Sequence, residues 1–398
     1  MDHPRNARPH PVLILLGLLA AVASAAAPEQ QGRSGEPWLR VQVRSPTATD
    51  TTDTEEGRLI VAAVDGGLLL ETSDTRYVTI QPDAIVTREA IVSPPAADEP
   101  RELGQRILAE LPAGFELHLT QHYIVCHDTS RDYARWAGGL FERLYDAFGN
   151  YWTRAGLELT AVERPLIVLI FANRRDYEAY AVRDLGAAAD RVVGYYNLLS
   201  NRIATYDLTG SDALPRRAGR SGPAVREILA QPEAAGLVST LVHEATHQLA
   251  FNRGMHRRLA PVPVWVSEGI ATVFETPDLR SSGGWRGIGM VNRSRLERFR
   301  RSYQPGDLEQ LVAADDRFRS ADTALDAYAA AWALSWFLME TKRPQFVAYL
   351  KTLAAKQPLT ADSPAQRRAD FTAAFGMPPA DLEPALLRHI SRLELRRP

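Results

Sequence analysis

The sequence of 398 residues contains a single cysteine, Cys126. One cysteine excludes an intramolecular disulfide and the thiolate-rich sites that bind structural zinc or iron–sulfur clusters. Cys126 belongs to the apolar run Tyr123–Cys126. We therefore expect a small buried core residue rather than a nucleophile.

Positive charge is not in excess. The chain has 46 Lys and Arg against 48 Asp and Glu, a formal net charge of −2. It lacks the surplus of cations that holds a phosphate backbone, so nucleic acid is not an expected partner. Hydrophobic residues make up 45% of the chain, which excludes a disordered chain and a polytopic membrane protein. The length suggests two or three domains.

The N-terminus has the layout of a secretory signal peptide. Arg5 and Arg8 precede an apolar run from Val12 to Ala27, which contains the small residues Ala23-Ser24-Ala25. This run is shorter than the roughly 20 residues that span a bilayer. We predict a signal peptide over residues 1–25 and an exported protein, periplasmic, cell-surface or extracellular, without stable membrane insertion once the signal is cleaved. Whether the signal is removed stays open.

Composition and patterning divide the remaining chain into three segments. Residues 26–56 are rich in Ser, Thr, Asp, Gly and Pro, which predicts a linker with one strand at 38–43. Residues 57–100 form a small β-rich domain and its linker, because apolar runs flank the turn signal Asp65-Gly66-Gly67. Residues 101–398 alternate between strand and helix patterns and then become helical.

The pattern in residues 101–398 predicts an α+β fold with a mixed sheet lobe at 101–235 and a helical lobe at 236–398. The expected elements are a strand or hairpin at 115–127, a helix at 133–155, a strand at 166–171, a helix at 175–182, strands at 192–198 and 202–207, and helices at 223–253, broken near Pro232, and 264–274, followed by a helix-rich remainder.

The helix at 223–253 contains His243-Glu244-Ala245-Thr246-His247. Two histidines at positions i and i+4 project from one helical face, so both imidazoles can bind one ion. Glu244 lies about 100° round the helix, where it can act as a general base on a water held by that ion. The alternative is a structural His pair with a helical Glu.

A catalytic zinc site needs a third protein ligand and an open position for water. Glu268 is the favoured third ligand, because it lies on the next predicted helix, placed by Pro261 and Pro263. His256 is the alternative, but it lies in the basic loop 253–258, which is more typical of a solvated face than of a carboxylate-binding patch.

The segments around His243-Glu244-x-x-His247 and Trp265-Val266-Ser267-Glu268-Gly269, with Glu275 beyond, resemble the gluzincin metallopeptidases. In particular, they resemble the bacterial family called domain of unknown function 1570. The resemblance implies a two-lobed zincin-like metallopeptidase core after the small β domain. It also implies one zinc ion bound by His243, His247 and Glu268, with Glu244 as the base.

The same resemblance implies a role for Tyr328, because related enzymes have a tyrosine in a later helix that donates to the developing oxyanion. The alternative is a core aromatic on an Ala-rich helix. Thr272 is either a residue that orients a ligand or an ordinary helix-face residue. The G-x-M-E-N segment of the aminopeptidases is missing; Gly194–Asn197 stands in the comparable place, as an edge strand that could pair with an extended peptide.

Together these patterns predict an exported zinc-dependent peptidase, an endopeptidase or one with a narrow peptide substrate. The first alternative is a zincin-like binding or surface-interaction module with little turnover, and the second is an amide hydrolase acting on non-peptide substrates. The cleavage preference and the oligomeric state stay open.

Overall fold

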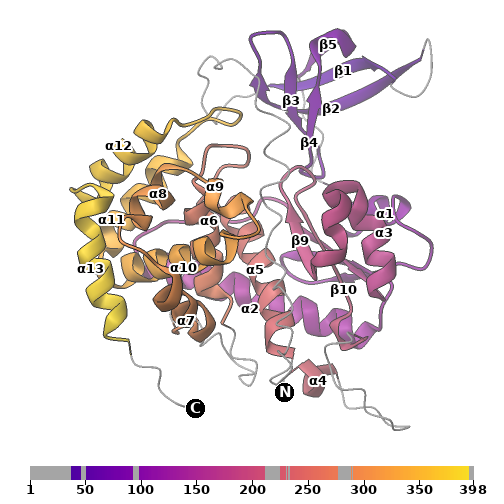
Figure 1. Ribbon diagram of the computed structural model, residues 1–398. Helices are drawn as coiled ribbons and strands as arrows, with labels where there is room; N and C mark the ends of the chain where they lie inside the picture. Colours follow the sequence, from indigo (N-terminus) through magenta and orange to yellow (C-terminus); the bar gives the residue numbers. More distant parts are fainter. Residues whose placement is uncertain are drawn as a thin grey trace.

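The computed structural model describes residues 37–45, 51–92, 98–210, 225–229, 231, 234–276, 288 and 290–393. The predicted signal peptide at 1–25 lies outside these residues. The described chain is α+β, with two five-stranded sheets and a helical C-terminal part. Figure 1 shows the N-terminal sheet at the top, the second sheet at the right and the C-terminal helices at the left, with helix α5 between the latter two.

The N-terminal sheet, sheet A, is entirely antiparallel, with strand order β4-β3-β2-β1-β5. Its strands are β1 (Trp38–Arg44), β2 (Thr52–Ala62), β3 (Leu68–Glu71), β4 (Tyr77–Ile80) and β5 (Ile85–Ile91). The strand expected at 38–43 is β1, which pairs with β2 on one side and β5 on the other, and residues 52–56 of the expected linker already belong to β2. The reason is alternation: Leu39 and Val41 are buried while Arg40 and Gln42 are exposed.

Sheet A contacts the rest of the molecule through both apolar and charged side chains. Val61 and Leu69 belong to the main hydrophobic core. Ion pairs join the buried Asp74 to Arg202 and the half-buried Glu71 to Arg258. Sheet A is therefore packed against the body that carries the candidate site described below.

The second sheet, sheet B, has the order β6-β7-β8-β10-β9. Its strands are β6 (Glu116–Leu119), β7 (Tyr123–His127), β8 (Leu166–Phe171), β9 (Gly194–Asn197) and β10 (Arg202–Tyr206). The three central strands are parallel and both outer strands are antiparallel. Cys126 lies fully buried in β7, and burial raises the pKa of its thiol to about 12, so the expectation of a core residue is confirmed.

The helices agree with the expected ranges 133–155, 175–182 and 264–274 to within three residues, whereas α1 had no predicted counterpart. They are α1 (Pro100–Ala109), α2 (Arg131–Arg154), α3 (Arg174–Leu185), α4 (Val225–Leu229), α5 (Ala235–Asn252), α6 (Val264–Phe274), α7 (Arg293–Ser302), α8 (Asp307–Ala313), α9 (Asp316–Arg319), α10 (Ala324–Thr341), α11 (Arg343–Ala354), α12 (Pro364–Phe375) and α13 (Pro379–Ser391). Side-chain caps define the starts of α2, α3, α7 and α12 among the described helices; for example, Ser130 accepts from the backbone N–H of Tyr133 and Asn173 accepts from that of Asp176.

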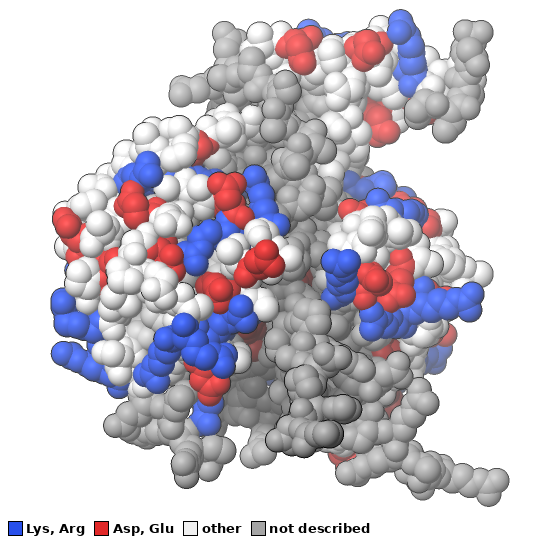
Figure 2. Space-filling view, viewed as in Figure 1, with Lys and Arg blue, Asp and Glu red and all other residues white. Residues whose placement is uncertain are grey.

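Basic and acidic side chains are interspersed over the described parts of the face in Figure 2. Within the described ranges, no helix is both long enough and apolar enough to cross a membrane.

Helices α6 and α10 approach each other closely at Gly269. A Cβ atom at this position would lie 2.1 Å from Ser335 Oγ and 2.6 Å from the carbonyl oxygen of Ala331. Only a residue without a side chain allows the two backbones to come this near. Gly269 directly follows Glu268, so the packing of α10 sets the position of that carboxylate.

We expect Gly269→Ala to lower the free energy of unfolding by about 1–3 kcal/mol, because the backbone carbonyl of Ala331 cannot move aside as a side chain can. Gly236→Ala is the matched control in α5, where an added Cβ meets nothing within 4 Å; it should raise stability by about 0.5–1 kcal/mol. Urea denaturation measures both. An unchanged or higher stability of Gly269→Ala would contradict the close contact.

Candidate metal centre

Helix α5 positions the two histidines. Its apolar residues Leu241, Val242, Ala245 and Leu249 are buried, which fixes the rotation of the helix against its neighbours. His243 and His247 then lie one turn apart on the same face, with 3.1 Å between their Nε2 atoms.

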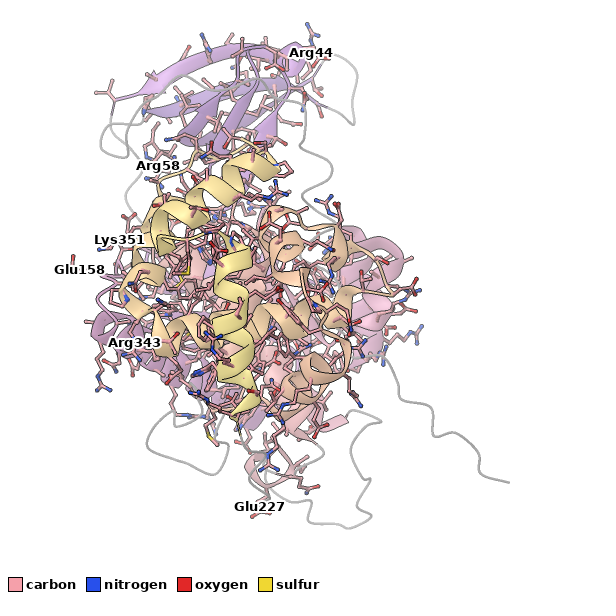
Figure 3. The ribbon with its side chains drawn as sticks, turned by 60° about the vertical axis from the view of Figure 1, so that its left-hand side comes forward. Arg44, Arg58, Glu158, Glu227, Arg343 and Lys351 are labelled. Atoms are coloured by element: carbon pink, nitrogen blue, oxygen red, sulfur yellow. The ribbon has the colours of Figure 1, made fainter. Side chains whose placement is uncertain are left out.

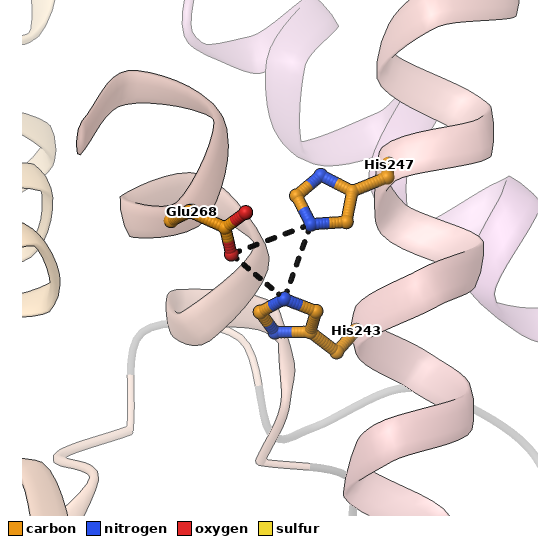
Figure 4. A group of neighbouring side chains, drawn as sticks. All are labelled: His243, His247 and Glu268. Atoms are coloured by element: carbon orange, nitrogen blue, oxygen red, sulfur yellow. Dashed lines mark hydrogen bonds and ion pairs between the residues drawn. The ribbon is translucent and has the colours of Figure 1, made fainter. Parts of the chain in front are cut away.

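Helix α6 brings the third residue to the same point, as Figure 4 shows. The chain turns back after α5, and α6 begins after Pro263. Glu268 Oε2 lies 3.0 Å from His243 Nε2 and 3.5 Å from His247 Nε2. The three side chains are buried, and their atoms could hold a metal ion.

The separations fit a tetrahedral cation. Two ligand atoms bonded to one ion at about 2.0–2.1 Å in a tetrahedron lie about 3.3 Å apart. The three measured separations, 3.0, 3.1 and 3.5 Å, fall around this value. Two imidazole nitrogens and one carboxylate oxygen are also a donor set that divalent transition metals accept.

Outer partners hold both imidazole rings. His243 Nδ1 lies 3.1 Å from Glu275 Oε2, and His247 Nδ1 lies 3.1 Å from Ser267 Oγ. Glu275 is held in turn, because its Oε1 accepts from Asn292 Nδ2 at 2.9 Å and from Arg295 Nε at 3.2 Å. The Nδ1 atoms are thus engaged outside the group, which turns both Nε2 atoms towards Glu268.

The buried charged groups shift one another's pKa values. Burial favours the neutral ring of His243, but hydrogen bonds to Glu268 and Glu275 outweigh it and raise the pKa of this imidazole to about 10. Burial also disfavours the charged form of Glu268, yet His247 and His243 overcome this and lower its pKa to about 2. Glu275 keeps a lowered pKa against its own burial, chiefly because of Arg295.

We expect metal affinity to rise with pH. Since the pKa of His243 is about 10, this ring carries a proton at neutral pH, and an entering cation has to displace it. Release of one proton per ion makes the affinity increase about tenfold for each pH unit. Competition with a chromophoric chelator between pH 6 and 8 measures the slope, and a flat profile would contradict the assignment.

Glu275→Gln is expected to weaken metal binding by about 10–100-fold, because the amide holds the imidazole of His243 less strongly than the carboxylate. The matched comparison is Ser267→Ala, which removes a neutral partner of His247 and should cost less. Metal titration in the presence of a competing chelator ranks the two variants. Equal affinities for both variants and the parent protein would show that the outer partners do not support the site.

Glu244 lies beside the three candidate ligands and is half-buried. Its Oε2 accepts from the backbone N–H of Tyr196 at 2.8 Å, so β9, the edge strand of sheet B, orients this carboxylate. Burial raises the pKa of Glu244, although His243 and His247 act in the opposite direction. The carboxylate and the three candidate ligands therefore form one electrostatically coupled group.

Tyr328 is buried on α10, with its ring against Phe318 and beneath the guanidinium of Arg295. Burial and the negative charge of Glu268 raise its pKa well above the ordinary value. The structure thus brings Tyr328 into the electrostatic environment of the site. Thr272 is different, because its hydroxyl donates to the carbonyl of Gly269 within α6.

The basic loop after α5 is not the solvated face that the sequence predicts. Arg258 is buried, donates to Glu71 and to the carbonyl of Leu198, and lies over the ring of Tyr77. The prediction of a solvated loop was wrong because sheet A covers the loop. The composition of the loop does not reveal this contact. His256 is also buried in this loop but does not belong to the candidate metal group.

Three groups that support the candidate site were not assigned roles from the sequence. They are Glu275 as a partner of His243, Arg295 as a partner of Glu275, and the backbone N–H of Tyr196. Glu275 follows Glu268 by seven residues, about two helical turns, so its place on the same face of α6 could have been inferred from spacing. Arg295 and Tyr196 come from distant segments and leave no such signal.

Comparison with known proteins gives one family. Residues 237–360 match the model of a family described as a protein of unknown function (DUF1570). This segment contains the described parts of α5 and α6 that carry the candidate metal group, and the match extends through α10. No curated protein matches the chain.

Proposed function

We propose that this chain, which matches the DUF1570 family model over its metal-site helices, is an exported zinc-dependent peptidase of the gluzincin type. The observation that carries the proposal is the convergence of His243, His247 and Glu268 with Glu244 at their side. In this proposal sheet B and the C-terminal helices are the two lobes of a zincin-like core.

Zinc is the proposed metal, because catalytic zinc sites commonly combine two His and one Glu and leave a position open. When bound, zinc acts as a Lewis acid that lowers the pKa of water to about 7 and polarises a carbonyl. His243, His247 and Glu268 would hold it. The buried, negatively charged Glu268 balances part of its charge.

Glu244 is the proposed general base. One of its oxygens is oriented by the N–H of Tyr196, and the carboxylate can accept a proton from the attacking water and deliver it to the leaving amine. A raised pKa suits this exchange, because a base that also returns the proton works best when its pKa lies nearer neutrality.

Tyr328 is the proposed second electrophile. Since its pKa lies well above the ordinary value, the phenol stays protonated at neutral pH and can donate a hydrogen bond. Such a donor stabilises the negative charge that develops on the carbonyl oxygen of the substrate.

The proposed substrate is an extended peptide. β9 is an outer strand of sheet B and lies next to Glu244, so a peptide could add to it as a further strand. The sequence lacks the G-x-M-E-N segment that binds a free N-terminus in the aminopeptidases. We therefore infer cleavage inside peptides rather than at their ends.

The test is hydrolysis of a peptide library by the purified full-length chain, with metal content measured in parallel. We expect about one zinc ion per chain, internal cleavages, loss of activity with a chelator and recovery with added zinc. Metal binding without any hydrolysis would support the binding-module alternative, and hydrolysis restricted to simple amides would support the amide hydrolase. Either result overturns the peptidase proposal.

A further inference from the structure

A cavity of about 250 Å³ lies where sheet A meets the body of the protein. Three segments line it: sheet A from β2 to β4, the loop 160–164 before β8, and the end of α5 with the loop that follows. Figure 3 labels Arg58, one of the lining residues, on sheet A. The candidate metal ligands do not line this cavity.

Positive charge dominates the wall of the cavity. Among the described residues that line it, the charged side chains are four guanidinium groups and two carboxylates, from Arg58, Arg164, Arg257, Arg258, Glu71 and Glu163. Guanidinium groups thus outnumber carboxylates, although each of the four also has a partner within the protein. Glu71 pairs with both Arg58 and Arg258, so one carboxylate forms ion pairs with two guanidinium groups. This excess of guanidinium groups over carboxylates favours an anionic ligand.

His256 adds a hydrogen-bond acceptor to the same wall. The ring is 1% exposed and lines the cavity. Its Nδ1 lies 3.0 Å from the carbonyl of Met255, and because a carbonyl only accepts, Nδ1 carries the hydrogen. Nε2 is then an acceptor, and it has no hydrogen-bond partner in the part of the chain that the structure describes. Burial lowers the pKa of this imidazole to about 3, so the ring stays neutral.

We propose that this cavity binds a small oxyanion that carries an O–H group, the chemistry shared by hydrogen phosphate and hydroxycarboxylates. The guanidinium groups bind the anionic oxygens, and His256 Nε2 accepts from the O–H. A buried acceptor that would otherwise stay unpaired discriminates strongly against a ligand without a donor. Sulfate, which has the shape of phosphate but no O–H at neutral pH, should therefore be rejected.

The test is equilibrium dialysis of the full-length chain against radiolabelled inorganic phosphate at pH 7 and fixed ionic strength. Unlabelled phosphate, sulfate and tartrate serve as competitors. We expect phosphate to compete at least about tenfold better than sulfate, equivalent to one hydrogen bond of about 1.4 kcal/mol. Tartrate tests which of the two ligand classes binds, because stronger competition by tartrate than by phosphate would identify a hydroxycarboxylate.

One variant and one treatment locate the ligand. His256→Phe should abolish the preference for phosphate over sulfate, while removal of bound metal with a chelator should leave phosphate binding unchanged, because the candidate metal ligands do not line the cavity. Equal competition by phosphate and sulfate, no measurable binding, or loss of binding after chelation would overturn the proposal. If His256→Phe does not fold, the selectivity of the parent chain still decides. These outcomes are independent of whether the protein proves to be a peptidase.

Discussion

Replacing Glu244 with Gln should reduce peptide hydrolysis by between about 10² and 10⁴-fold, the usual contribution of a general acid or base. The amide keeps the size of the side chain and can still accept from the N–H of Tyr196, but it cannot take a proton from water. Glu244 is not among the three residues that could hold the ion, so the zinc content should stay near one per chain. Turnover on the best library peptide and metal analysis of the same sample measure the two effects.

The matched control for this variant is Tyr328→Phe, which removes a proposed donor to the oxyanion without touching the base. It should lower turnover by a smaller factor and keep the same metal content. Full activity in Glu244→Gln would refute the base assignment. Loss of metal together with activity would mean that Glu244 is a ligand or a structural residue instead.

Replacing Glu268 with Gln is expected to weaken zinc binding by more than about 100-fold, the upper end of the effect of losing an outer partner of a ligand. The loss is large because the neutral amide neither binds the cation strongly nor balances its charge among buried groups. Hydrolysis should disappear with the metal. Metal content after dialysis against a weak chelator measures the effect.

Glu158→Gln is the control, because it neutralises an exposed carboxylate, which Figure 3 shows at the periphery of the molecule. It should leave zinc binding unchanged. Circular dichroism should show that Glu268→Gln remains folded. Stoichiometric zinc in a folded Glu268→Gln protein would remove Glu268 from the ligand set.

Much of the fold could be predicted from the sequence where a signal is local. The periodicity of 264–274 predicts α6 with its observed ends, and the continuous apolar run at 166–171 predicts β8. The strand at 38–43 was also predicted, but its place in sheet A was not, because a short alternating segment among Ser, Thr and Gly residues does not reveal that it will pair with both β2 and β5. Strand pairing over long separations depends on the whole sheet.

Some parts of the candidate site could likewise be predicted from the sequence, and others could not. His243 and His247 follow from one helical turn, and Glu268 follows from the next helix. The partnership of Glu275 with Arg295 joins two segments separated by a turn that leaves no periodic signal. The burial of Arg258 depends on sheet A, about 190 residues earlier in the chain, so the loop's composition alone predicted the wrong environment.

The seven-residue spacing between Glu268 and Glu275 restricts insertions and deletions in this segment of the chain. Both carboxylates contact the same imidazole, His243, from opposite sides of its ring. Seven residues bring an α-helix back to within about 20° of its starting direction, whereas inserting or deleting one codon between them would swing one carboxylate about 100° away. Single-residue insertions or deletions between residues 268 and 275 are therefore incompatible with the site.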